Sequence, residues 1–193
     1  FGRRSLLWGG PAIIAVTLMA LLSSSVRFAT DNYWWRVKLW GKIAATMVLL
    51  AGAYYLGQQG IRAGREYVWL QRAKQAGLYT PEQAECFKRA FNIEPGNSET
   101  AYALGDLYRM KSSEGGDNCR EQAEQAMSWL DRSIKLNPWY AYSYLRYGWC
   151  LDWLDRFDDS PRYFQRALQL EPNGYYMAAH VGLHHVQTEN FAA

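Results

Sequence analysis

The sequence predicts an all-α protein in which a transmembrane helical hairpin is followed by a superhelix of paired helices. Two long uncharged segments lie in the first third of the chain, with a short basic and aromatic segment between them. The remainder contains three self-similar segments that each close on Glu-Pro or Asn-Pro. Basic residues dominate the first part and acidic residues the second, which indicates two differently built regions.

Charge and cysteine content exclude several classes of protein. Residues 1–75 contain ten Lys or Arg side chains and two acidic ones, whereas residues 76–193 contain eleven basic and sixteen acidic side chains. A basic region can bind nucleic acid or a membrane surface. Because these charges flank uncharged segments, we expect a lipid bilayer as the partner and no nucleic acid. The three cysteines form no CxxC pair and are too few for a four-cysteine zinc site.

Residues 1–61 are predicted to form a membrane hairpin with spans at about 5–26 and 43–61. The two uncharged segments contain 22 and 19 residues. A helix needs about 20 apolar residues to cross the hydrocarbon core of a bilayer. Two buried core helices are the alternative interpretation, and the first segment alone also resembles a cleaved signal peptide.

The segment between the spans has the composition of a membrane–water interface. Its cations alternate with amphipathic aromatic rings, and both are favoured at the level of the lipid headgroups. The flanks of the second span carry equal net positive charge, so the positive-inside rule predicts no orientation. The predicted interface residues are Arg27, Trp34, Trp35, Arg36, Lys38, Trp40 and Lys42.

Residues 62–193 are predicted to form about three and a half helical repeats. The segments "FKRAFNIEP", "LDRSIKLNP" and "FQRALQLEP" align, and their prolines, Pro95, Pro138 and Pro172, are 43 and 34 residues apart. A glycine stands ten residues after each proline. This pattern resembles the tetratricopeptide repeat (TPR) family, whose 34-residue repeat is a pair of helices, A and B. The nine extra residues of the second repeat are predicted to lie in its A–B turn, at 111–118.

The TPR resemblance assigns a packing role to one set of residues. Small residues on helix A allow helix B to approach, large side chains fill the gap, and proline ends helix B. The fourth repeat has residues for helix A alone, so we expect the native chain to continue past Ala193. The predicted packing residues are Phe87, Ala90, Pro95, Gly105, Tyr108, Pro138, Gly148, Leu151, Phe164, Ala167, Pro172 and Gly182.

Two groups of polar side chains are candidates for chemistry. His180 and His184 have the HxxxH spacing of metal ligands but lack a zincin's glutamate, and His185 is expected at the inward position of its helix. No phosphate-binding loop or nucleophile motif is present in the sequence. The sequence therefore predicts no catalytic site, no metal and no cofactor within these residues. An exposed ion-pair network is predicted at the third A–B turn from Asp152, Asp155, Arg156, Asp158, Asp159 and Arg162.

A dense set of aromatic residues follows Pro138, and some of them exceed what repeat packing requires. Aromatic side chains in a concave helical groove suit a partner helix or an extended peptide. We therefore predict a protein partner in the TPR groove, with Tyr140, Trp149 and Trp153 as the candidate contacts.

Both regions are also similar to parts of one known arrangement. The stretches "PAIIAVTLMALLSSSVRFATDNYWWRV" and "LRYGWCLDWLDR…YFQRALQLEPNGYY" resemble the closing membrane segment and the TPR region of bacterial O-antigen ligase/polymerase-type proteins. The resemblance implies a bacterial inner-membrane protein of polysaccharide assembly, with the TPR side unassigned and the catalytic residues upstream. The family's His and Asp-Phe-Asn run before Pro11 is replaced by "RRSLLWGG", so no catalytic residue is carried over.

Three functions follow from these observations. The first is a membrane-anchored TPR scaffold that binds a protein partner. The second is an accessory structural subunit of a larger bacterial membrane complex, without a role in glycan chemistry. The third is part of an active polyprenyl-linked glycan ligase whose catalytic residues lie outside these 193 residues.

Overall fold

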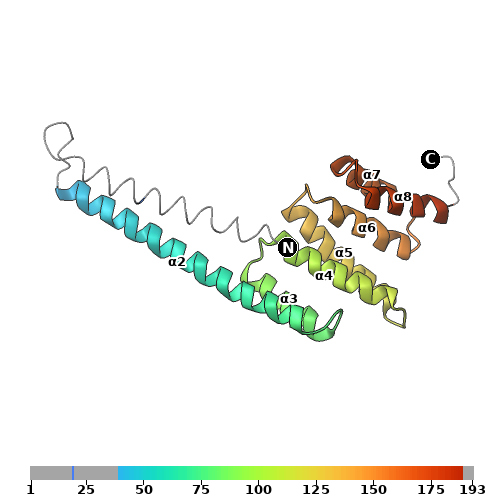
Figure 1. Ribbon diagram of the computed structural model, residues 1–193, viewed down its shortest axis with the longest axis horizontal. Helices are drawn as coiled ribbons and strands as arrows, with labels where there is room; N and C mark the ends of the chain where they lie inside the picture. The colour runs from blue at the N-terminus through green and yellow to red at the C-terminus, as the bar shows by residue number, and fades with distance from the viewer. Residues whose placement is uncertain (1–18, 20–38, 189–193) are drawn as a thin grey trace. The chain divides into compact units, whose positions relative to one another are not determined.

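The computed structural model describes Met19 and residues 39–188, and this part of the chain is all-α, with seven helices and no strand (Figure 1). The chain divides into two units, Phe1–Tyr54 and Tyr55–Ala193. The predicted boundary between residues 61 and 62 falls within an unbroken helix. The helices are α2 (Leu39–Gln75), α3 (Pro81–Ile93), α4 (Ser98–Ser113), α5 (Cys119–Leu136), α6 (Ala141–Trp153), α7 (Pro161–Leu170) and α8 (Tyr175–Gln187).

α2 is the longest helix, and much of its surface is apolar and exposed. It spans 37 residues and contains an 18-residue window with a mean hydropathy of 1.3, none of which is buried. Its exposed side chains include Met47, at 63%, and Leu50, at 60%. By length and composition this helix can cross a membrane. The predicted second span, residues 43–61, lies within it.

The other predictions for the membrane region fall largely outside the described residues. The first span, residues 5–26, has only Met19 in the described part. Of the predicted interface residues, Trp40 and Lys42 lie in the first turns of α2, where Trp40 is 80% exposed. Arg27, Trp34, Trp35, Arg36 and Lys38 lie outside the described residues.

The end of α2 is the first helix of the repeat array. The Gln83 side-chain amide on α3 donates to the Ala73 carbonyl at 3.1 Å, and Arg89 lies over the Trp69 ring at 4.7 Å. The buried carboxylate of Glu66 accepts hydrogen bonds from the side chains that begin α4, those of Asn97 and Thr100. These contacts connect α2 to both α3 and α4.

The second helix of each pair ends at a proline signal. α3, α5 and α7 each end two residues before a predicted closing proline, Pro95, Pro138 or Pro172. In each case the residue after the helix donates its backbone N–H to the carbonyl four residues earlier, at 3.1, 2.9 and 3.0 Å. The proline then lacks the N–H that another turn would need, and it disfavours helical geometry in the residue before it.

Two glycines allow the paired helices to approach closely. A Cβ atom on Gly105 of α4 would lie 2.6 Å from Leu130 Cγ on α5. A Cβ atom on Gly148 of α6 would lie 2.9 Å from Phe164 Cε1 on α7. Leu130 and Phe164 are almost completely buried. Each pair is therefore formed by a glycine on helix A and a large side chain on helix B.

The remaining predicted packing residues divide into two groups. Ala90, Tyr108, Leu151 and Ala167 are buried, and Phe87 packs half-buried against the core. Gly182 differs, because it is exposed and a Cβ atom there would meet nothing within 4 Å among the described residues. In the two earlier repeats the glycine meets the B helix that follows it, and the residues after Thr188 lie outside the described part, so the role of Gly182 stays a prediction.

The extra residues of the second repeat lie mainly in its helices, which corrects the prediction of a loop at 111–118. α4 and α5 have 16 and 18 residues, whereas α6 and α7 have 13 and 10. α4 continues through Ser112 and Ser113, whose hydroxyls donate to the Arg109 and Met110 carbonyls at 2.8 and 2.7 Å. Such local bonds satisfy the hydroxyls inside a helix. The turn itself contains Gly115 and Gly116, both at positive φ.

We expect Gly105→Ala to lower the free energy of unfolding by about 1–3 kcal/mol, because the new methyl group overpacks the contact with Leu130. Gly182→Ala is the matched control. It adds a methyl group in open space, so its higher helix propensity should leave stability unchanged or raise it by up to about 1 kcal/mol. Urea unfolding followed by circular dichroism measures both. Equal destabilisation by the two substitutions would contradict the close approach at Gly105.

Candidate functional site

The first helix of each repeat contributes to one surface, which we call the inner face. It comprises half-buried side chains of α4, α6 and α8 and of Tyr140 just before α6, and α6 contacts both α4 and α8. A row of four tyrosine rings runs across it. Tyr102 meets Tyr140 at 5.1 Å between ring centroids, Tyr140 meets Tyr142 at 5.7 Å, and Tyr142 meets Tyr176 at 5.9 Å. These contacts order the rings without burying them fully.

A charged cluster lies on the same face. Asp106 Oδ1 is 2.9 Å from Arg109 Nε, to which it is hydrogen-bonded, and 3.2 Å from Arg146 Nε on the next inner helix. The two arginine side chains are only 13% and 12% exposed. One carboxylate therefore faces two largely buried guanidinium groups. The cluster has one positive charge in excess.

Trp149 stacks beside this cluster. The Arg146 and Arg109 guanidinium groups lie 4.6 and 5.0 Å from the centroid of its ring, within the range of cation–π attraction. The His180 ring of α8 meets the Trp149 ring edge-on, with 4.1 Å between the centroids. The His180 ring also meets the Tyr176 ring edge-on, at 4.3 Å. The tryptophan thus connects side chains from three inner helices.

Burial and neighbouring charges determine the protonation states of the titratable side chains on the inner face. Burial acts to lower the pKa of Arg146, but the Asp106 carboxylate and the Tyr102 hydroxyl beside it raise that pKa, so the side chain stays charged. Burial raises the pKa of Tyr140 to about 12, so its hydroxyl stays protonated. Burial lowers the pKa of His180, and the positive charges of Arg146 and Arg109 lower it further. His180 is therefore neutral at pH 7.

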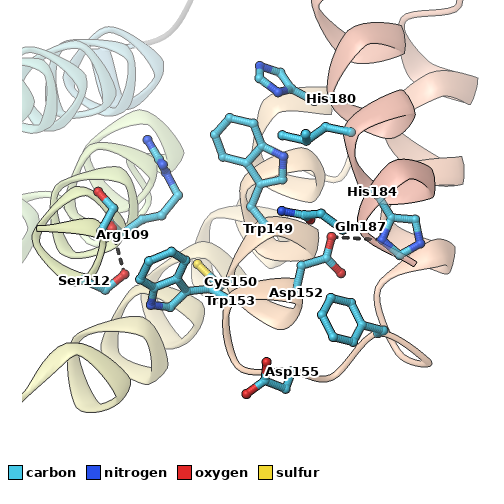
Figure 2. Close-up of a pocket in the computed structure, with 13 residues that line it drawn as sticks. Arg109, Ser112, Trp149, Cys150, Asp152, Trp153, Asp155, His180, His184 and Gln187 are labelled. Atoms are coloured by element: carbon cyan, nitrogen blue, oxygen red, sulfur yellow. Dashed lines mark hydrogen bonds and ion pairs between the residues drawn. The ribbon is translucent and has the colours of Figure 1, made fainter. Parts of the chain in front are cut away.

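A pocket of about 620 Å³ adjoins the inner face toward the carboxyl ends of α4, α6 and α8. Figure 2 shows its side chains, which include Arg109, Trp149, Trp153 and His184. Cys150 also lines it, and burial raises the pKa of this thiol to about 12. The thiol stays protonated and is not a nucleophile at neutral pH.

The predicted exposed ion-pair network is present only in part. Arg156 pairs with Asp159 at 2.6 Å on the surface, as the sequence suggests. Asp152 is instead buried, and its Oδ2 accepts a hydrogen bond from His184 Nδ1 of α8 at 2.9 Å. The prediction was wrong for Asp152 because neighbouring charges suggested a solvated turn. The deciding partner lies 32 residues further along the chain.

The inward histidine of α8 is His184 and not His185. His184 follows the buried Met177 by seven residues, or two helical turns, and is 4% exposed, whereas His185 lies one position further around the helix. The HxxxH pair does not converge on a common point. His180 contacts Trp149 and Tyr176, and His184 contacts Asp152. No group of three or more metal-ligating side chains occurs among the described residues.

The three predicted partner contacts lie on or beside this surface. Tyr140 is in the tyrosine row, and Trp149 and Trp153 line the pocket. Sequence reasoning missed the charged cluster of Asp106, Arg109 and Arg146. The sequence did contain a signal for part of this face, namely polar and aromatic residues at equivalent positions of neighbouring repeats. Tyr142 and Tyr176 are 34 residues apart, and so are Arg146 and His180.

Comparisons with known proteins identify the fold. No family model matches the chain, and no curated protein sequence does. Solved structures do match. The first TPR domain of Spaghetti (RPAP3), bound to an HSP90 peptide, is 18% identical with a TM-score of 0.54, covering 67% of this chain and 98% of that one. MamA is 19% identical with a TM-score of 0.55, covering 81% and 88%.

The TPR domain of Arabidopsis OM64 is 15% identical with a TM-score of 0.55, covering 65% of this chain and 98% of that domain. Identities this low show the fold alone. The chain therefore contains a TPR array, in which α4, α6 and α8 are helices of type A, and α5 and α7 are helices of type B.

We expect the pKa of His180 to lie below 6.5 and to rise toward 6.5 in Arg146→Met, because burial and the neighbouring guanidinium groups disfavour the imidazolium. The unfolded chain then binds this proton more tightly than the folded one. The contribution of neutral His180 to the free energy of unfolding is therefore fully present above pH 6.5. It is lost as the pH falls from 6.5 through the pKa of His180 in the folded protein. An NMR titration of the His180 ring measures this. Arg132→Met, on α5 beside Trp129, is the control and should leave the pKa unchanged.

Proposed function

We propose that this chain is a membrane-anchored TPR module whose inner face binds a segment of a protein partner. The observation that carries the proposal is the concentration of ordered, half-buried tyrosines, arginines and a tryptophan on α4, α6 and α8. Tyr, Trp and Arg are the residue types that dominate the binding energy of protein interfaces. Their contacts with one another reduce the side-chain entropy that a partner's binding would cost.

Neighbouring structures support the same function. The first TPR domain of Spaghetti (RPAP3) is bound to the HSP90 peptide SRMEEVD. The second TPR domain of human RPAP3 is in complex with the HSP70 peptide SGPTIEEVD, at 18% identity and a TM-score of 0.52. A repeat array of this shape can therefore accommodate an extended peptide. We infer a comparable peptide partner for this chain, with its own sequence preference.

Binding at the inner face is tested by cross-linking and then by the affinity for a synthetic peptide. A photoreactive residue in place of Tyr142 should cross-link a partner segment in native membranes, because this position is on the inner face. The same residue in place of Trp129, on α5, should not. The cross-linked segment, made as a synthetic peptide, should then bind the purified chain and lose at least roughly tenfold in affinity with Arg146→Glu.

The control charge reversal is Arg132→Glu, at an exposed arginine of α5 that stacks on Trp129 and does not lie on the inner face, and circular dichroism of both variants checks that they are folded. It should leave the peptide affinity unchanged. If no segment cross-links at Tyr142, or if both reversals weaken the peptide equally, the inner face is not the binding surface.

We propose that α2 is the anchor. Large exposed apolar surfaces are rare in soluble proteins, and the unburied apolar window of α2 would be covered by lipid in a membrane. The chain from Arg62 onward then forms the TPR domain outside the bilayer, and the hairpin of residues 1–61 fixes it to the membrane.

We expect a fragment of residues 62–193 to be helical and monodisperse without detergent, whereas the full chain should require detergent and should sediment with liposomes. Circular dichroism, size-exclusion chromatography and liposome flotation measure these properties. Leu50→Arg, in the apolar part of α2, should reduce flotation, and Arg62→Leu should not. A full chain that remains soluble and monodisperse without lipid or detergent would remove the anchor from the proposal.

Two finer proposals concern the setting of this module. We propose a bacterial inner membrane as its location, and the support for this is the resemblance of the two quoted sequence stretches to O-antigen ligase/polymerase-type proteins. The alternatives are an accessory subunit of a larger membrane complex and a portion of an active glycan ligase. The mass of the native protein and its stoichiometric partners distinguish these settings.

A further inference from the structure

The pocket beside the inner face contains a buried carboxylate oxygen without a hydrogen-bond donor. The Asp152 side chain is 8% exposed, and its Oδ2 is held by His184 Nδ1. Its Oδ1 accepts no hydrogen bond from the described residues. A buried acceptor left without a donor destabilises the fold, so such an atom requires an explanation.

The pocket that Asp152 lines also has apolar, accessible walls. Trp153 is 50% exposed and Leu183 is 48% exposed, and both line the pocket together with Phe157. The ring of Trp153 has no ring or cation contact among the described residues, unlike that of Trp149, which lies against Arg109 and Arg146. Figure 2 shows Asp152 on the same helix as the two tryptophans, directed toward His184.

We propose that this pocket binds the side chain of a lysine or arginine from the partner segment, with its cationic group donating to Asp152 Oδ1. The aliphatic stem of such a side chain would pack against Leu183 and Phe157. Its positive charge would face both the carboxylate and the free ring of Trp153, which attracts cations through its negative face. A charge-assisted hydrogen bond would then satisfy the unpaired oxygen.

The other charges in the pocket are compatible with a bound cation. Arg109 also lines the pocket, but its guanidinium is hydrogen-bonded to Asp106 and stacked on Trp149. Asp155, a second lining carboxylate, pairs with Arg120 at the surface. Burial and the arginines lower the pKa of His180, which is therefore uncharged at pH 7. Asp152 is thus the pocket-lining carboxylate that is not paired with an arginine among the described residues.

This inference rests on the proposed binding of a protein segment by the inner face, and it specifies one anchor residue of that segment. The two proposals fail in different experiments. The cross-linking at Tyr142 and the effect of Arg146→Glu test the inner face, and the pocket is tested without any knowledge of the partner.

The probes are blocked arginine, N-acetyl-arginine methylamide, and its neutral isostere, N-acetyl-citrulline methylamide. The full chain in detergent micelles is titrated with each, and the indole N–H signal of Trp153 is followed by NMR after assignment with Trp153→Phe. We expect saturable shifts with blocked arginine, and at least roughly tenfold weaker binding of the citrulline probe, because citrulline keeps the shape of the side chain but lacks the charge and has a carbonyl oxygen in place of one N–H donor group.

Asp152→Asn should weaken the arginine probe to the level of the citrulline probe, and it retains an oxygen that can accept from His184 Nδ1. Asp131→Asn, at the exposed pair with Lys135 on α5, is the matched control and should change nothing. Should Asp152→Asn unfold the protein, the comparison of the two probes on the unsubstituted chain still decides. Equal binding of both probes, or shifts of Trp153 with methyl β-glucoside instead, would overturn the proposal.

Discussion

The structure depends on the close approach of paired helices at a glycine. Gly105 against Leu130, and Gly148 against Phe164, leave no space for a Cβ atom. Each contact fixes the distance between one A helix and one B helix, and the next A helix packs against the pair so formed. Because each repeat contacts mainly its neighbours, the spacing within one helix pair determines where the next pair packs. The positions of α4, α6 and α8 follow from it.

The inner face uses residues that this packing does not require. Along α6, Arg146, Trp149 and Trp153 are three and four residues apart, so they share one side of the helix. Gly148 and Leu151 turn toward α7 and the core. One short helix therefore supplies both the packing of the array and a chemically distinct surface. Under the proposed function, substitutions on the inner face would change binding while the glycine contacts keep the fold.

The sequence predicted the repeat architecture because its signals are local. A proline ends a helix by its own ring, and a glycine permits close approach by lacking a side chain, so the pattern of these residues predicts helix pairs directly. The pairing of Asp152 with His184 is not local, since the two residues belong to different repeats. A row of aspartates at a turn gave no indication that one of them points inward. The same holds for Asp106, whose role depends on an arginine from the next repeat.

The charged cluster of the inner face and the carboxylate of Asp152 have opposite charge, and their order along α6 would matter to the proposed partner segment. Arg146, with Arg109, gives the inner face an excess of positive charge, whereas Asp152 is a negative group six residues further along α6. A segment that meets both must carry an acidic group and a basic group at a matching separation and in one order. Reversing the segment would place like charges together, which costs binding energy. If the inner face and the pocket bind as proposed, complementary charges along one helix would select both the composition and the direction of the bound segment.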